Sequence, residues 1–162
     1  MRNFQRDLAI GAVAGAAAAA AMSAFQGLWL KQWPTRNLVR PRTDVEVMKM
    51  IAGRTGRKAG IRLSRGQREA VGLLLHYGFG AAAGAMYAVL AEESELVSRG
   101  FGAVFGTLFF AAGDAFAPKL VKPKVHKSEA ISQFYEWMTH VVYGVTLEAG
   151  RRAGKAVSRQ AA

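Results

Sequence analysis

Apolar residues along the chain gather into four blocks, and the charged residues gather between these blocks. The first block covers residues 8–30 and the second covers residues 70–91, and neither contains Asp, Glu, Lys or Arg. A helix needs about 20 apolar residues to cross the hydrocarbon of a bilayer, so both blocks are long enough to do so. The pattern therefore predicts a membrane protein.

The third and fourth blocks cover residues 100–117 and 131–149 and are less uniformly apolar. Helices that already pack in a bundle shield polar groups from lipid. We therefore expect an all-α fold, an integral membrane four-helix bundle that forms one domain over residues 1–162. Two spans followed by a soluble pair of helices is the alternative that the pattern leaves open. The polar residues of these two blocks are Asp114 in the third, and Glu136, His140 and Glu148 in the fourth.

The segment between the first two blocks, residues 31–69, is a basic loop that contains a short helix of its own. Thr43 followed by Glu46 forms a capping box, the pattern that begins a helix. Val47, Met50 and Ile51 then fall on one helical face, and Gly53 is expected to end the helix. This predicts a short amphipathic helix that lies on the membrane surface or caps the bundle.

A second capping box precedes the second apolar block. Ser64 with Gln67 places the start of the long helix before the membrane, so that its first turns are in water. The intervening residues 53–66 are rich in glycine and in basic side chains, and we expect a mobile loop there.

Pairs of glycines four residues apart recur in three of the four predicted spans. Packing, rather than hydrophobic force, holds helices together in lipid, and glycine lets two backbones approach closely. The pairs predict a compact bundle and leave open whether some of them form a dimer. These packing glycines are Gly11 and Gly15, Gly80 and Gly84, and Gly102 and Gly106.

The net charge of +11 comes from the segments between the blocks. Four spans would place both termini on one side and the loops around 31–69 and 118–130 on the other. Those two loops carry 15 Lys and Arg residues, whereas the terminal side carries seven. Basic loops stay in the cytoplasm, so we expect a multi-pass protein of a bacterial inner membrane with both termini outside.

The basic loops also indicate partners. Lys and Arg beside a bilayer attract anionic lipid, which we expect as a partner, and we expect no nucleic acid. A homo-oligomer or a larger membrane complex is the other expected association. The absence of cysteine excludes disulfides and thiolate metal sites. Arg2 and Arg6 before an apolar run also fit a cleaved signal peptide, although 8–30 is longer than the usual core of one.

Nearly all strongly polar side chains within the predicted spans fall in the half of the membrane that adjoins the basic loops. Glu136 and His140 share a helical face because they are four residues apart. An ionisable group that faces lipid costs about 3 kcal/mol or more at the bilayer centre, so this face is expected to turn inward. The predicted members of this polar pocket are Glu136, His140, His76, Tyr77, Asp114 and Gln26.

Four interpretations of the polar pocket stay open. It forms internal hydrogen bonds that fix helix packing, or it conducts protons or small ions. Glu136, His140, His76 and Asp114 are also ligand types for zinc, manganese or iron, although their spacing is not diagnostic. Haem between His76 and His140 is the weakest interpretation, because their expected depths differ. We expect no metal and no cofactor.

Two stretches carry a family resemblance: HYGFGAAAGAMYAVLAE, residues 76–92, and EWMTHVVYGVTLEAGRR, residues 136–152. Together with WPTRNLVRPRTD after the first block, they resemble the YagU-like family of small bacterial inner-membrane proteins. The resemblance implies a multi-spanning inner-membrane protein and supplies no biochemical activity. The first loop departs from the family pattern in being strongly basic. The matching positions are His76, Tyr87, Glu92, Glu136, His140, Glu148, Arg151 and Arg152.

Glu92 and Glu148 lie at the ends of the second and fourth predicted spans on the terminal side. Arg151 and Arg152 are near enough in sequence to pair with either acid. We expect interfacial ion pairs among these four residues that fix the depth of the helices.

The sequence contains no phosphate-binding glycine loop and no nucleophile elbow, so we expect that the protein is not an enzyme. The favoured function is an accessory or scaffold protein that packs against itself or a larger membrane complex. The alternative is a minimal transporter of protons, small ions or solutes that uses Glu136 and His140 as a half-channel.

Overall fold

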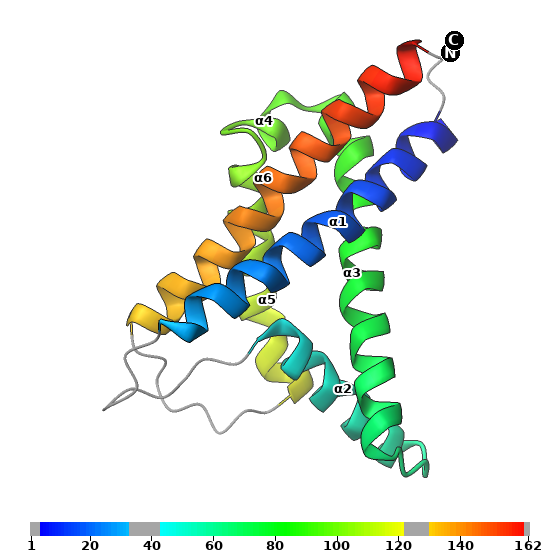
Figure 1. The fold of residues 1–162 in the computed structure, drawn as a ribbon, viewed down its shortest axis with the longest axis vertical. Helices are drawn as coiled ribbons and strands as arrows, with labels where there is room; N and C mark the ends of the chain where they lie inside the picture. The colour runs from blue at the N-terminus through cyan, green and yellow to red at the C-terminus, as the bar shows by residue number, and fades with distance from the viewer. Residues whose placement is uncertain (1–3, 33–42, 122–129, 161–162) are drawn as a thin grey trace.

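The computed structural model describes residues 4–32, 43–121 and 130–160, apart from the side chains of Asp114 and of residues 116–121. The described residues form six helices and no strand, which confirms the all-α prediction for this part of the chain (Figure 1). The helices are α1 (Phe4–Lys31), α2 (Asp44–Lys58), α3 (Arg65–Glu93), α4 (Glu95–Ser98), α5 (Ala103–Val121) and α6 (Ala130–Gln160).

The four long helices α1, α3, α5 and α6 coincide with the predicted spans, but some of their ends differ. The helix expected to start at residue 100 starts at Ala103. Gly100, Phe101 and Gly102 before it have φ angles of 59°, 54° and 86°, which no right-handed helix can contain. At the other end of the chain, α6 continues well past the predicted end at residue 149. Its extra turns carry basic residues that pair with acids on other helices.

Both predicted capping boxes are present. The hydroxyl of Thr43 accepts from the backbone N–H of Glu46 at 3.2 Å, and the Glu46 carboxylate accepts from the N–H of Thr43 at 2.8 Å. Ser64 and Gln67 make the same reciprocal pair at the start of α3. Each box satisfies backbone donors that the first turn of a helix leaves without partners.

The short helix α2 does not end at Gly53, so the prediction that glycine stops it there is wrong, and residues 53–58 are helical rather than a loop. Glycine lowers helix propensity by about 1 kcal/mol, but tertiary packing offsets that loss. The buried Gly53 lies against α3, where a Cβ in its place would be 3.1 Å from Cδ of Arg68.

A Schellman motif ends α2 after Lys58. The N–H of Ile61 donates to the carbonyl of Gly56 at 2.8 Å, and the N–H of Gly60 donates to the carbonyl of Arg57 at 3.2 Å. Gly60 has a φ angle of 76°, a conformation that glycine adopts without a steric penalty. The chain then turns back into α3, so that α2 and α3 form a helical hairpin.

The central helix of the fold is α1, which packs against α3 and against α6, while α5 packs on α6 and α2 packs on α3. In Figure 1, α1 and α6 run side by side, and the start of α1 lies at the same end of the molecule as the end of α6. The buried face of α1 is made mostly of alanine and glycine, which keeps the neighbouring helices close.

The contact between α1 and α3 is made by glycines from both helices. A Cβ on Gly11 would overlap the carbonyl oxygen of Gly84, and a Cβ on Gly15 would overlap that of Gly80. These two predicted pairs therefore face each other inside one chain.

The third predicted pair lies at the contact between α5 and α6. A Cβ on Gly102 would overlap the carbonyl oxygen of Gly144, and one on Gly106 would overlap that of His140. Gly102 precedes α5 rather than lying within it. All six packing glycines thus lie at contacts within the chain.

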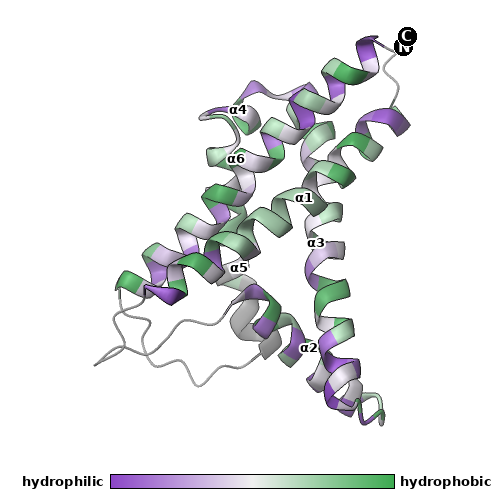
Figure 2. Ribbon diagram, in the orientation of Figure 1, coloured by the Kyte–Doolittle hydropathy of each residue, from purple (hydrophilic) through white to green (hydrophobic). Residues whose placement is uncertain are grey.

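Two helices among the described residues, α1 and α3, are long and apolar enough to cross a membrane. The apolar stretch of α5, Ala103–Gly113, is shorter. Figure 2 shows hydrophilic residues on the α2–α3 hairpin, around α4 and at the ends of α1 and α6 near the termini, with others along α6 and a largely apolar middle of α1. Two of the four predicted spans therefore have the length and composition that crossing a bilayer needs.

Candidate functional site

Six charged side chains from three helices meet near the two ends of the chain, and we call them the charged cluster. Acids come from α1, α3 and α6, whereas all three cations come from α6. The members of the charged cluster are Asp7, Glu92, Glu148, Arg151, Arg152 and Lys155.

Glu148 is the fully buried centre of the charged cluster. Its Oε2 accepts from the Tyr87 hydroxyl at 2.8 Å and from Nε of Arg151 at 2.7 Å. Its Oε1 accepts from Nη2 of Arg151 at 3.0 Å and from Nε of Arg152 at 2.6 Å. Four donors to one carboxylate, two of them from a single guanidinium, are the conditions under which a buried charge is stable.

Arg151 extends the charged cluster to α3. Its Nη1 donates to Oε1 of Glu92 at 2.8 Å, while its other nitrogens hold Glu148. The hydrogen bonds to Glu148 raise the pKa of the Arg151 guanidinium above its usual value, and the charge of Glu92 adds to this effect. Arg151 therefore carries a permanent positive charge between two acids.

Lys155 extends the charged cluster to α1. Its ammonium group forms an ion pair with Glu92, and its Nζ lies 3.7 Å from Oδ1 of Asp7. Asp7 is 6% exposed although it lies in the first turn of α1, where a carboxylate also interacts favourably with the helix dipole. Each pair in the charged cluster thus joins α6 either to itself or to another helix.

The spacing of the charged residues along α6 brings its acid and its three cations together. Residues 148, 151, 152 and 155 are spaced so that all four lie on one face of a helix. Three acids and three bases make the charged cluster neutral as a whole, which lowers the cost of burying it. Arg152, the most exposed of its cations, also lies over the ring of Phe101 at 4.6 Å.

The predicted interfacial residues Glu92, Glu148, Arg151 and Arg152 are thus brought together by the structure. Sequence reasoning missed two other members, Asp7 and Lys155. Asp7 stands directly before the first apolar block, and a lone acid at that place was the available signal. No local pattern could pair it with Lys155, because the two residues lie at opposite ends of the chain.

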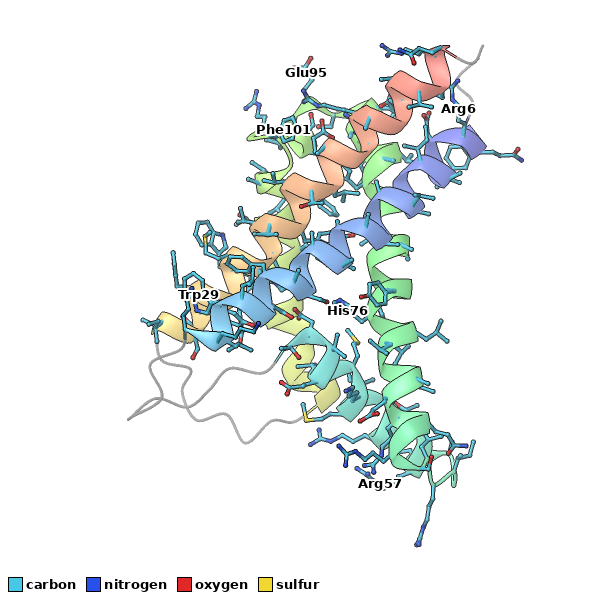
Figure 3. All side chains as sticks on the ribbon, viewed as in Figure 1. Arg6, Trp29, Arg57, His76, Glu95 and Phe101 are labelled. Carbon is cyan, nitrogen blue, oxygen red and sulfur yellow. The ribbon has the colours of Figure 1, made fainter. Side chains whose placement is uncertain are left out.

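The predicted polar pocket divides among different helix contacts. Nε2 of His76 lies 3.0 Å from the hydroxyl of Ser23 and 3.3 Å from the carbonyl oxygen of Ala19, so His76 joins α3 to α1. Figure 3 shows its side chain directed from α3 toward α1. Nε2 of Gln26 donates instead to Asp44, which joins α1 to the start of α2.

His140 belongs to the contact between α5 and α6. Its Nδ1 lies 2.8 Å from the carbonyl oxygen of Glu136, one turn earlier on the same helix. Its ring packs against Phe109 and Phe110, with centroids 5.9 Å and 5.6 Å away. The described contacts of His140 are therefore with α5 and with its own helix, whereas those of His76 are with α1 and Tyr77.

The remaining two members of the polar pocket are Tyr77 and Asp114. Tyr77 is 37% exposed, and its ring lies edge-on to that of His76 with centroids 5.2 Å apart. The side chain of Asp114 lies outside the described residues. Among the residues whose side chains are described, no group of three or more His, Asp or Glu is arranged to hold a metal ion.

A buried tyrosine that sequence reasoning did not single out also joins two long helices. The hydroxyl of Tyr143 on α6 donates to the carbonyl oxygen of Gly80 on α3 at 2.6 Å. This bond reaches the same glycine that Gly15 of α1 contacts, so three helices meet at one point.

Chemically, these groups are suited to holding helices together, because the described contacts of His76, His140 and the charged cluster are with other parts of the same chain. Comparisons of the chain with protein-family models, with curated proteins and with solved structures found no match.

Proposed function

We propose that this chain is a multi-pass protein of a bacterial inner membrane that serves as an accessory or scaffold component and does not catalyse a reaction. Its four long helices form the membrane bundle, as the YagU-like resemblance also implies. Its apolar outer surface faces lipid and the other members of an assembly.

The charged cluster is the observation that carries this proposal. The buried Glu148 is surrounded by donors from Tyr87, Arg151 and Arg152, so it is held as a charged, hydrogen-bonded group. A catalytic or proton-carrying acid needs a way to exchange its partners for substrate or water. A carboxylate with both oxygens bonded to the protein instead fixes the relative positions of α3 and α6.

Exposed apolar side chains on the two apolar helices support a location in the membrane. Only a third of the most apolar window of α1 and of α3 is buried within the chain. Large exposed apolar surfaces mark contact with lipid or with other proteins. Examples on these helices are Val13 at 73% exposure, Leu28 at 63%, Leu74 at 72% and Phe79 at 58%.

Single-cysteine labelling in intact cells tests this topology, because the natural chain has no cysteine that would react. Cysteines are introduced separately at Lys58, Glu95 and Lys124 and are treated with a thiol reagent that cannot cross the inner membrane. Four spans predict that Glu95→Cys is labelled and that Lys58→Cys and Lys124→Cys are protected. Labelling at position 124 would contradict four spans and favour two spans with a soluble helical pair.

A further inference from the structure

The hairpin of α2 and α3 contains a cavity of about 510 Å³ that the scaffold function does not use, and we call it the α2–α3 groove. It lies at the end of the molecule away from the charged cluster, where Figure 3 shows Arg57 among other polar side chains. The groove is lined by Lys49, Met50, Gly53, Arg54, Arg57, Arg65, Arg68 and Glu69.

Close packing of the two helices builds the α2–α3 groove. A Cβ on Gly72 of α3 would lie 3.0 Å from the backbone nitrogen of Lys49, so the helix axes are close at that level. Around Gly53 on α2, Cδ of Arg68 and Nη1 of Arg57 lie 3.1 Å and 3.8 Å from the position that a Cβ would occupy. Two arginines from different helices therefore converge on one glycine.

Positive charge dominates the lining of the α2–α3 groove. Five of its residues are Lys or Arg and one is acidic, an excess of four positive charges. The acid, Glu69, lies 3.4 Å from Arg65 in an exposed pair, which offsets little of that charge. Other acids of α2 are engaged elsewhere, since Asp44 accepts from Gln26 and Glu46 caps the helix.

We propose that the α2–α3 groove binds a phosphate group, with Arg57 and Arg68 as its principal ligands. Guanidinium groups bind phosphate oxygens through paired, charge-assisted hydrogen bonds, which a flexible ammonium group cannot reproduce. A phosphate in the groove would also offset part of the excess positive charge of its lining. The buried Gly53 has no side chain, so the aliphatic part of Arg68 lies close to α2 beside Arg57.

A lipid headgroup is one source of this phosphate, and a soluble phosphate compound is the other. Leu73 and Leu74 follow Arg68 by about one and a half turns of α3, and they are 43% and 72% exposed. Acyl chains could lie along them while the headgroup occupies the α2–α3 groove at the membrane surface. The lipid source rests on the proposed membrane location, whereas the phosphate chemistry does not.

The test uses the full-length protein in neutral detergent. Native mass spectrometry measures binding of phosphatidylglycerol and, separately, of zwitterionic phosphatidylcholine. In a second arm, thermal unfolding is recorded in inorganic phosphate and in chloride at matched ionic strength. The site variant is R57Q/R68Q, and the matched control is R99Q/R159Q, which removes the same charge from exposed positions outside the groove.

Binding of one phosphatidylglycerol per chain that is about tenfold weaker in R57Q/R68Q, with R99Q/R159Q unchanged, supports the lipid source. Stabilisation by phosphate over chloride that only the site variant loses supports a soluble ligand. Equal weakening in both double variants, or no effect of either ligand on the wild type, overturns the proposal. Cysteine labelling tests the membrane scaffold separately, so the two failures are distinguishable.

Discussion

Tyr87 and Glu148 are 61 positions apart in the chain, yet the tyrosine hydroxyl donates a 2.8 Å hydrogen bond to the buried carboxylate. This contact joins the last turns of α3 to α6 and lies in the middle of the charged cluster. Because both side chains are fully buried, the contact cannot be exchanged for water without opening the bundle. The pair therefore indicates which interactions hold the helices at this end of the molecule.

Replacing Glu148 with alanine is expected to cause a large loss of stability. It leaves the Arg151 guanidinium, which is 11% exposed, with one of its two acids. Removing one partner of a buried ion pair costs about 3–5 kcal/mol. Unfolding of purified protein in neutral detergent measures the effect, with Glu95→Gln as the exposed control. A loss below about 1 kcal/mol would show that the charged cluster does not fasten the helices.

Tyr87→Phe removes a single hydroxyl and leaves the ring contact with Phe105, whose centroid is 4.8 Å away. Glu148 keeps its donors from Arg151 and Arg152, so we expect a loss of about 1–2 kcal/mol in the free energy of unfolding. The same detergent unfolding measurement applies. A loss as large as that of Glu148→Ala would mean that the tyrosine, rather than the arginines, stabilises the carboxylate.

Gly84→Ala tests the close contact of α1 and α3. Its new methyl group would overlap the backbone of Gly11 and Gly15, which cannot move aside as a side chain can. We expect a loss of about 1–3 kcal/mol from overpacking.

Gly78→Ala is the matched control for this substitution. It lies in the same helix with nothing within 4 Å of its Cβ position, so alanine there should be neutral or stabilising. Equal effects of the two substitutions would contradict the glycine contact.

Proton flux separates the scaffold from the transport alternative. In liposomes that contain the purified protein, the scaffold function predicts no flux above that of empty liposomes at any pH between about 5 and 8, the range in which histidine titrates. It therefore predicts no difference between wild type and Glu136→Gln. A flux that depends on pH and that Glu136→Gln abolishes would favour a transporter, provided that circular dichroism shows the same helicity in the variant.

The long helices and both capping boxes could be predicted from the sequence, because apolar length and capping chemistry are local signals. The end of α2 could not. Gly53 reads as a helix stop in isolation, and only its contact with Arg68 on α3 shows why the helix continues. The turn before α5 could not be predicted either, because Phe101 adopts a positive φ angle that its residue type does not favour.

Residue types identified the polar side chains but not their partners. Glu148 and Arg151 are near in sequence, so their pairing could be expected, whereas the ion pair of Lys155 with Asp7 depends on how α1 and α6 run side by side. The sequence assigns His76 and His140 to one pocket because both fall in the same half of the predicted membrane. Depth fixes a position along the bundle but not the direction in which a side chain points, and their described contacts lie at different helix interfaces.

The scaffold function is tested most directly by native mass spectrometry of gently extracted wild-type protein beside Glu136→Gln. A scaffold function predicts that the wild type carries further protein mass, either copies of the chain or a stoichiometric partner. It also predicts that the variant loses no metal or small-molecule mass. A monomer without protein partners that carries a stoichiometric metal or small molecule, lost in Glu136→Gln, would contradict the scaffold function and make the polar pocket a ligand site.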